Sequence, residues 1–269
     1  MTPVTPPLID IGINLGHESF AADREAVMAR ARAAGIVQMI ITGASGQGSR
    51  EALALARTDP GRLFATAGVH PHHATELNAP LLAQLEALAR EPEVVAIGEC
   101  GLDYFRDFSP RDVQQRAFHQ QLELAARVGK PVFLHERDAH DDFVSILREH
   151  RASLVGGIAH CFTGTGEQLQ RYLRLDLAIG ITGWICDERR GAHLPALMRE
   201  IPAGALQLET DAPYLLPRDL KPRPPSRRNE PMQLRHIAAV VARARGESVE
   251  ELSAAATAAS RALFRLPPV

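Results

Sequence analysis

Metal-binding side chains follow four separate apolar, strand-like runs of this chain: Glu99, His135, His160 and Asp211. The runs that directly precede them read VVAIG, VFL, VGGIA and LQLET. In a parallel barrel the C-terminal ends of the strands lie on one face, where residues from several strands form the active site. Two imidazoles and two carboxylates suit a hard or borderline divalent cation. These residues therefore predict a metal-dependent active site.

The elements that would position them are eight short apolar strands alternating with helical segments. Strands are expected at 7–13, 36–43, 63–69, 94–98, 131–134, 154–159, 176–182 and 205–210. Helical spacing of apolar residues marks 24–35, 79–92, 114–129 and 167–175, with a final helical segment at 231–264. This alternation predicts an α/β fold, a (β/α)₈ TIM barrel formed by one domain over 1–269. An open doubly wound sheet would need a glycine-rich nucleotide turn after the first strand, which GINLGHES lacks.

Composition indicates an ordinary globular protein, with 45% apolar and 23% charged residues. The net charge of -2 means that contact with a polyanion must depend on local basic patches. Neither a membrane helix nor a secretory signal is visible, and the three cysteines form no C-x-x-C pair, so a cytoplasmic location without a membrane partner is expected. Cys100 and Cys161 directly follow candidate ligands, and strand alternation is expected to turn both away from the barrel mouth, into packing.

Roles for the four residues follow from their order along the chain. Glu99, His135 and His160 come from successive strands and could bind one cation together, with Glu99 bridging to a second. Asp211 comes from the last strand and could hold the second cation or accept a proton from water. Each residue alone could instead cap a strand through hydrogen bonds, but four at equivalent places favour a metal site.

A series of motifs runs in order through nearly the whole chain: DIGINL, GVHPHH, AIGECGLDYFR, HERDAH, AHCFTGT, GITGWICDERRG, ETDAPYLLPRDL and SRRNEP. They resemble the TatD family of metal-dependent deoxyribonucleases, which are TIM barrels among the amidohydrolase-like hydrolases. DIGINL and GWICDERRG are closer to the family's founding member than to its sister branches. The resemblance implies divalent-metal-dependent hydrolysis of DNA, with 3′-to-5′ exonuclease activity. It places the metal ligands on Glu99, His135, His160 and Asp211, and an active-site histidine on His70.

One departure from the family pattern concerns the first strand. Many relatives carry an H-x-H pair where this chain has Gly12 and Asn14. Asn14 could still offer a carbonyl oxygen to a cation or an amide to phosphate. We therefore expect one or two divalent cations of unequal affinity, Mg²⁺ above all, with Mn²⁺ or Zn²⁺ as alternatives.

Substrate contacts are expected from Asn14, Arg137, Trp184 and Arg190. Trp184 could stack on a base or only pack against the barrel rim. Arginines gather in the segments after the strands, including the proline- and arginine-rich stretch 217–231. They could form a basic rim for phosphates or could pair with acids, and the structural role is favoured for Arg228. The expected partner is single-stranded DNA or a DNA 3′ end, with RNA as an alternative, bound by a monomer.

The favoured mechanism is metal-assisted hydrolysis, in which Asp211 accepts a proton from water and His70 or an arginine steadies the charge on the phosphoryl oxygens. A small-molecule amidohydrolase or lactonase would use the same ligands. A non-catalytic nucleic-acid-binding barrel is the second alternative, because Gly12 and Asn14 replace histidines. The basic loops and the retained ligands favour a nuclease.

Overall fold

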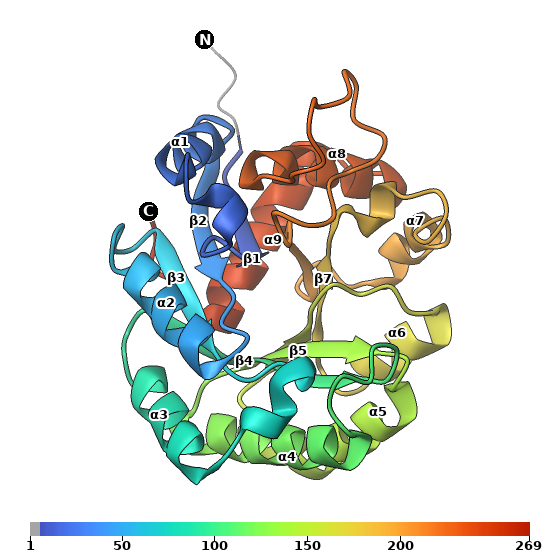
Figure 1. Cartoon of the computed structure of the whole chain (residues 1–269). Coiled ribbons are helices and arrows are strands. Elements are labelled where there is room, and N and C mark those ends of the chain that lie inside the picture. Colours follow the sequence, from blue (N-terminus) through green and yellow to red (C-terminus); the bar gives the residue numbers. More distant parts are fainter. Residues whose placement is uncertain (1–5) are drawn as a thin grey trace.

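Eight parallel strands form a single sheet in the computed structural model, which describes residues 6–269 (Figure 1). Neighbours in the sheet follow the order of the chain, from β1 to β8. The strands are β1 (Leu8–Ile13), β2 (Ile36–Ile41), β3 (Leu63–Ala67), β4 (Val94–Asp103), β5 (Val132–Arg137), β6 (Gly157–Ala159), β7 (Ala178–Ile181) and β8 (Leu206–Leu208). All eight predicted strands are present.

The sheet is closed where β1 meets the segment that follows β8. The Asp211 N–H donates to the Gly12 carbonyl at 2.8 Å, and the Asn14 N–H donates to the Ala212 carbonyl at 2.8 Å. These hydrogen bonds join the first and last strands at their C-terminal ends, so the predicted (β/α)₈ barrel is confirmed. They also place Asn14 and Asp211 side by side at the mouth of the barrel.

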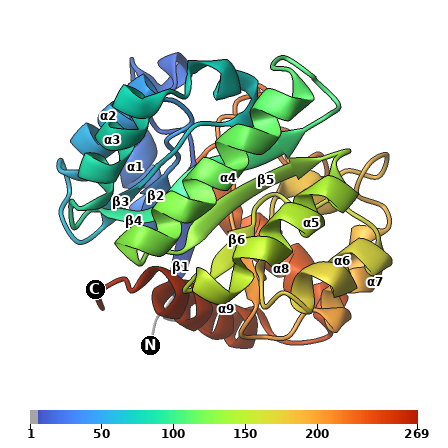
Figure 2. The same ribbon diagram turned by 90° about the horizontal axis from the view of Figure 1, so that it is seen from below.

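Helices surround the strands on the outside, as both views show (Figures 1 and 2). They are α1 (Arg24–Ala33), α2 (Gly46–Ala56), α3 (Ala79–Ala89), α4 (Arg111–Val128), α5 (His140–His150), α6 (Gly166–Leu173), α7 (Leu194–Leu197), α8 (Leu234–Arg245) and α9 (Val249–Phe264). The helices α2, α5 and α7 were not predicted. The segment 231–264 contains two helices because Gly246, with φ of 77°, ends α8 and the Ser248–Glu251 capping box starts α9. Among the described residues, no helix has the length and apolar character of a membrane span.

Two apolar clusters hold the barrel together. The larger one joins strand residues to the helices, and Phe118 of α4 stacks on Phe143 of α5 with 5.1 Å between ring centroids. The smaller cluster lies within the ring of strands and includes Phe133 of β5 and Phe264 of α9. Each such side chain contributes about 1.5–3 kcal/mol when it is fully buried. The two clusters fix the strands whose ends carry the site.

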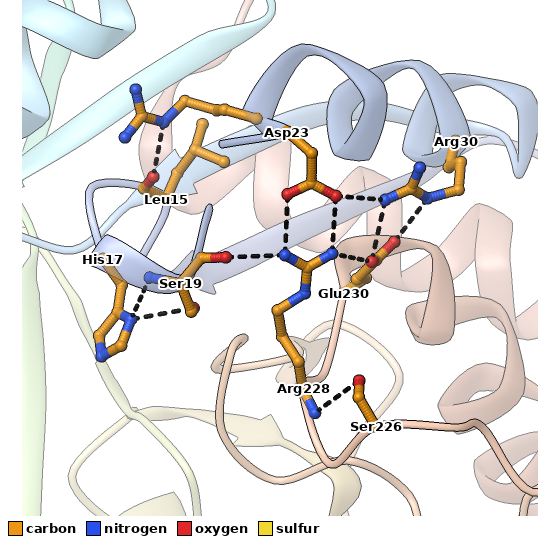
Figure 3. Close-up of polar contacts among 9 residues, drawn as sticks. Leu15, His17, Ser19, Asp23, Arg30, Ser226, Arg228 and Glu230 are labelled. Atoms are coloured by element: carbon orange, nitrogen blue, oxygen red, sulfur yellow. Dashed lines mark hydrogen bonds and ion pairs between the residues drawn. The ribbon is translucent and has the colours of Figure 1, made fainter. Parts of the chain in front are cut away.

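The stretch between β8 and α8 is a long loop, drawn in orange beside α8 in Figure 1. Arg228 anchors its far end to α1, as Figure 3 shows. Its guanidinium makes two 2.8 Å hydrogen bonds to Asp23, one of 2.8 Å to Glu230 and one of 2.7 Å to the Ser19 carbonyl. Arg30 bonds to the same two carboxylates. The structural role predicted for Arg228 is therefore confirmed.

Candidate active site

A cavity of about 1280 Å³ opens at the C-terminal ends of the strands. Its lining includes every residue proposed from the sequence as ligand or catalytic group: His70, Glu99, His135, His160 and Asp211. The strand-end rule therefore located the correct face of the barrel. The rule was wrong about the exact positions, because Glu99 and His135 lie within β4 and β5, and Asp211 follows Leu208 by three residues.

A β-bulge in β4 directs Glu99 to the cavity. Gly98 pairs with Phe133 and Cys100 with Leu134, so Glu99 is the extra residue without a partner on β5. Gly98 has φ of 142°, and a Cβ there would collide with the Phe133 carbonyl oxygen, so only glycine fits. The strand resumes after the bulge and extends to Asp103, which explains why β4 is longer than predicted.

Three imidazoles converge on one oxygen of Glu99. Glu99 Oε1 lies 3.4 Å from His70 Nε2, 3.0 Å from His135 Nδ1 and 3.4 Å from His160 Nε2. Burial opposes ionisation of the carboxyl group, but the surrounding histidines hold the pKa of Glu99 well below its usual range. Glu99 is therefore an anion at the centre of a buried imidazole cluster.

His135 is held between two carboxylates. Its Nδ1 faces Glu99, and its Nε2 lies 3.3 Å from Asp103 Oδ2. Burial disfavours the charged ring, but these hydrogen bonds raise the pKa of His135 to about 9. His72 Nε2 lies 2.8 Å from the same oxygen of Asp103. Asp103 therefore orients two histidines at the cavity wall.

His160 is oriented by a fully buried acid, Glu209. The distance from His160 Nδ1 to Glu209 Oε2 is 2.7 Å, and Glu209 Oε1 accepts the Cys161 N–H at 2.6 Å. Burial opposes the charged ring, but Glu209 and Glu99 raise the pKa of His160 well above its usual value. His160 therefore presents Nε2 to the cavity and holds Nδ1 against Glu209, as histidine ligands of metals usually do.

His70 is the neutral member of the cluster. Its Nδ1 accepts the His72 N–H at 3.1 Å, which leaves Nε2 facing Glu99. Burial lowers the pKa of His70 to about 4 despite the nearby Glu99 carboxylate. A neutral imidazole at this place can bind a cation or donate a hydrogen bond to substrate.

Asp211 lines the same cavity close to His160, with Asn14 beside it. The Asn14 amide donates to Asp211 Oδ1 at 2.9 Å. Burial, offset in part by His160, raises the pKa of Asp211 to about 7, and the Glu99 charge adds to the increase. The preceding Thr210 donates its N–H to the buried Asp10 at 2.9 Å, which fixes this segment against β1. Asn14 was proposed as a substrate contact, and in the structure its amide positions Asp211.

The donor atoms form two groups, each with three atoms within 4.8 Å of one another: His70 with Glu99 and His135, and His160 with Cys161 and Asp211. Glu99 Oε1 also lies 3.4 Å from His160 Nε2, so the assignment of Glu99, His135 and His160 to one cation stays a prediction. The second group corrects the expectation for Cys161, which lines the cavity. Cys161 lies beyond the end of β6 with φ of 51°, so strand alternation does not govern its direction. Cys100 is buried in the larger apolar cluster, as expected.

The donor set fits divalent cations. Three imidazoles and two carboxylates line one cavity, and further acids lie behind His135 and His160. Gly12 explains the absence of the first of the two histidines, because a Cβ there would collide with Glu209 Oε2 and lie 3.2 Å from Phe133 Cζ. The space that a side chain at position 12 would occupy is filled by Glu209.

The other proposed substrate contacts line the same cavity. The Arg137 guanidinium lies 3.7 Å from the centroid of Phe105, and that of Arg190 lies 5.3 Å from the centroid of Trp184. Neither arginine forms an ion pair with the described part of the chain, residues 6–269. In contrast, Arg189 and Arg218 pair with Asp187, so only part of the expected basic rim is available for phosphates.

Exposed aromatic side chains concentrate at this mouth. Phe105, Phe108 and Tyr214 are 50%, 66% and 50% exposed and all line the cavity. They are the aromatic members of the exposed large apolar residues within the described range 6–269. Exposed rings at a cavity rim can stack on bases, which every single strand offers.

Sequence reasoning missed the acids behind the histidines, Asp103 and Glu209. Asp103 lies four residues after Glu99, so alternation places the two on one face of a strand that extends this far. Glu209 lies within the run LQLET, where it was read as part of an apolar strand. An acid in an otherwise apolar run was the available signal.

The closed parallel barrel, with imidazoles and carboxylates converging at its C-terminal mouth, defines the chain as a TIM-barrel protein with its candidate active site at the strand ends. Residues 9–265 match the family model described as TatD related DNase. The chain is a member of this family, whose enzymes are hydrolytic nucleases.

Proteins of known sequence and structure resemble the chain over nearly its full length. The protein of Erwinia billingiae named 3′-5′ ssDNA/RNA exonuclease TatD is 55% identical over 260 residues, which cover 97% of this chain and 100% of the relative. The protein of the same name from Edwardsiella piscicida is 54% identical, covering 96% and 100%. The crystal structure of YJJV, a TatD homolog of Escherichia coli, superposes with a TM-score of 0.88 at 32% identity, covering 97% and 98%.

Proposed function

We propose that this protein is a divalent-metal-dependent exonuclease that hydrolyses phosphodiester bonds of single-stranded DNA and RNA from the 3′ end. The convergence of His70, His135 and His160 on Glu99 Oε1 carries the proposal, because it gathers imidazole nitrogens and a carboxylate oxygen, which are ligands that divalent cations take. Family membership and the names of relatives that are 55% and 54% identical support the substrate class.

In this proposal the cations are held by Glu99, His135, His160 and Asp211, with His70 beside Glu99. Mg²⁺ is the favoured ion, and Mn²⁺ or Zn²⁺ would also suit imidazole and carboxylate ligands. A bound divalent cation would neutralise phosphate charge and make water more acidic. Asp103 and Glu209 would keep the two histidine ligands in the required orientation.

Asp211 would receive the proton of the attacking water. Its carboxylate lines the cavity beside His160, where a positioned base can take a proton from water. The Asn14 amide donates to one oxygen of Asp211, which leaves the other oxygen to accept the proton. His70 would donate Nε2–H to a phosphoryl oxygen as its charge grows.

The substrate strand would lie across the aromatic rim of the cavity. Arg137 and Arg190 would contact phosphates, while Phe105, Trp184 and Tyr214 would stack on bases. Paired bases in a duplex do not expose their faces to such rings. The geometry therefore supports single strands over duplex.

The decisive experiment measures digestion of 5′-labelled single-stranded DNA and RNA. Each substrate is incubated with the protein without chelator, with chelator, and with Mg²⁺, Mn²⁺ or Zn²⁺ added after chelation. We expect a ladder of products shortened from the 3′ end that requires added metal and is lost in Glu99→Gln. The matched control is Glu123→Gln, which changes an exposed glutamate of α4 and should digest normally. Undiminished digestion after exhaustive chelation, or by Glu99→Gln, contradicts the proposal.

A further inference from the structure

A second cluster of metal-binding side chains lies outside the catalytic cavity. Cys186 ends the 3₁₀ turn Gly183–Cys186 after β7, Asp219 lies in the long loop after β8, and His236 belongs to α8. One donor atom from each lies within 4.8 Å of the other two. The residues that line the catalytic cavity include none of the three.

The three side chains differ in burial in a way that suits a metal site joining the barrel to the loop. Cys186 is buried, with 6% of its surface exposed. The side chains of Asp219 and His236 are 45% and 29% exposed, and His236 Nε2 lies 2.7 Å from Asp219 Oδ1. The sulfur is thus a fixed point of the barrel, whereas the other two side chains can adjust from the solvent side.

The donor chemistry selects the ion. Mg²⁺ prefers an all-oxygen shell, whereas a thiolate, an imidazole and a carboxylate together favour Zn²⁺. Tetrahedral zinc bonds of about 2.0–2.3 Å place ligand atoms roughly 3.4–3.6 Å apart. The hydrogen bond between His236 and Asp219 would have to open by roughly 0.7 Å, which two partly exposed side chains permit. Water would take the fourth position.

We propose that Cys186, Asp219 and His236 form a zinc site that fastens the long loop after β8 to the barrel. Binding replaces the Cys186 S–H bond by a sulfur–zinc bond, and the proton leaves to solvent. Because binding releases this proton, zinc would bind more tightly as pH increases.

The long loop connects the proposed zinc site to the rim of the catalytic cavity. Its far end is held to α1 by Arg228, as Figure 3 shows, and Asp219 would fasten the near end. Between the two anchors the loop lines a separate cavity of about 480 Å³. This cavity shares Trp184 and Leu215 with the catalytic cavity. Zinc bound at the proposed site would therefore hold in place the wall of the catalytic cavity beside Trp184.

Cobalt provides the first test, because Co²⁺ replaces Zn²⁺ and a cobalt–thiolate bond gives a near-ultraviolet charge-transfer band. Co²⁺ is titrated into the full-length, chelator-treated Cys161→Ser variant, because this substitution removes the thiol of the catalytic cavity. We expect the band in this variant and its loss when Cys186→Ser is added. His119→Gln is the matched control, because it alters the His119–Glu149–His150 group on α4 and α5. Absence of the band from Cys161→Ser, or its persistence without Cys186, overturns the proposal.

Trypsin provides the second test, since it can cut this loop after Arg218 and Arg227, whereas Lys221 and Arg223 precede prolines. Zinc should slow cleavage of the wild type but not of Asp219→Asn or His236→Gln, whose altered side chains are partly exposed and compatible with folding. Each variant should also weaken zinc binding by more than the roughly 10- to 100-fold that loss of an outer-shell partner costs. Equal protection of wild type and variants would mean that zinc acts elsewhere. Neither test depends on nuclease activity.

Discussion

Replacing Asp211 by asparagine separates its chemical role from its structural one. Asparagine keeps the shape of the side chain and an oxygen that can accept the hydrogen bond from Asn14. It removes the negative charge and the basic oxygen. Loss of a positioned proton acceptor costs roughly 10²–10⁴ in rate, and loss of a metal ligand adds to this. Turnover of single-stranded DNA should therefore fall by at least about 100-fold.

The same substitution should stabilise the metal-free protein at alkaline pH. Burial raises the pKa of Asp211 from 3.8 to about 7, so the folded chain favours the protonated acid more than the unfolded chain does. This favourable contribution is complete below pH 3.8 and is lost as pH rises to about 7. At pH 8 this difference in pKa lowers the free energy of unfolding of the wild type by at most about 4 kcal/mol. Asp211→Asn removes this penalty, so its Tm at pH 8 should be higher by up to roughly 10 °C.

Thermal unfolding in chelator at pH 4 and pH 8 measures this effect. Asp211→Asn should unfold at a higher temperature than the wild type at pH 8 and at nearly the same temperature at pH 4. Saturating metal should reverse the order at pH 8, because only the wild type retains the full ligand set. A pH-independent difference in Tm would refute the electrostatic reasoning, and near-normal turnover would remove Asp211 from the mechanism.

Three further perturbations test the surrounding structure. Glu209→Gln should weaken metal binding about 10- to 100-fold, measured by calorimetric titration, because His160 loses the acid that orients it. Gly12→Ala should cost about 1–3 kcal/mol in urea unfolding, because the new Cβ collides with Glu209, whereas Gly204→Ala, with open space around it, should cost little. Arg228→Ala should lower Tm and speed trypsin cleavage after Arg218, with a smaller effect in high salt, while the neighbouring substitution Arg227→Ala should change neither Tm nor cleavage after Arg218.

The fold was predictable because each strand is a compact apolar run whose neighbours are helical. The boundaries were less predictable where strands continue through polar residues. β5 extends through His135 to Arg137, and β4 continues past its bulge to Asp103. Conversely, β8 ends at Leu208: Glu209 still donates its N–H to Ile181 of β7, but Thr210 and Asp211 donate theirs to β1. In this barrel a polar residue after an apolar run can face the cavity from within a strand and need not mark the end of that strand.

The candidate ligands could be proposed because imidazoles and carboxylates near strand ends are conspicuous. The proximity of Cys161 to His160 and Asp211 could not be predicted, because it depends on the positive φ of Cys161, and the direction of Glu99 depends on the bulge in β4. Neither feature is visible in apolar spacing. The aromatic rim was missed because Phe105 and Phe108 lie in a loop, where a single apolar residue is unremarkable until its exposure is known.

The protonation of the histidines links the missing acids to the metal. Hydrogen bonds to the neighbouring acids raise the pKa of both His135 and His160, so both rings are protonated at neutral pH in the metal-free chain. Metal binding to these rings would release their protons from the nitrogen atoms that become ligands. Metal affinity should therefore increase with pH until both rings lose their protons even without metal, which for His135 occurs at about pH 9.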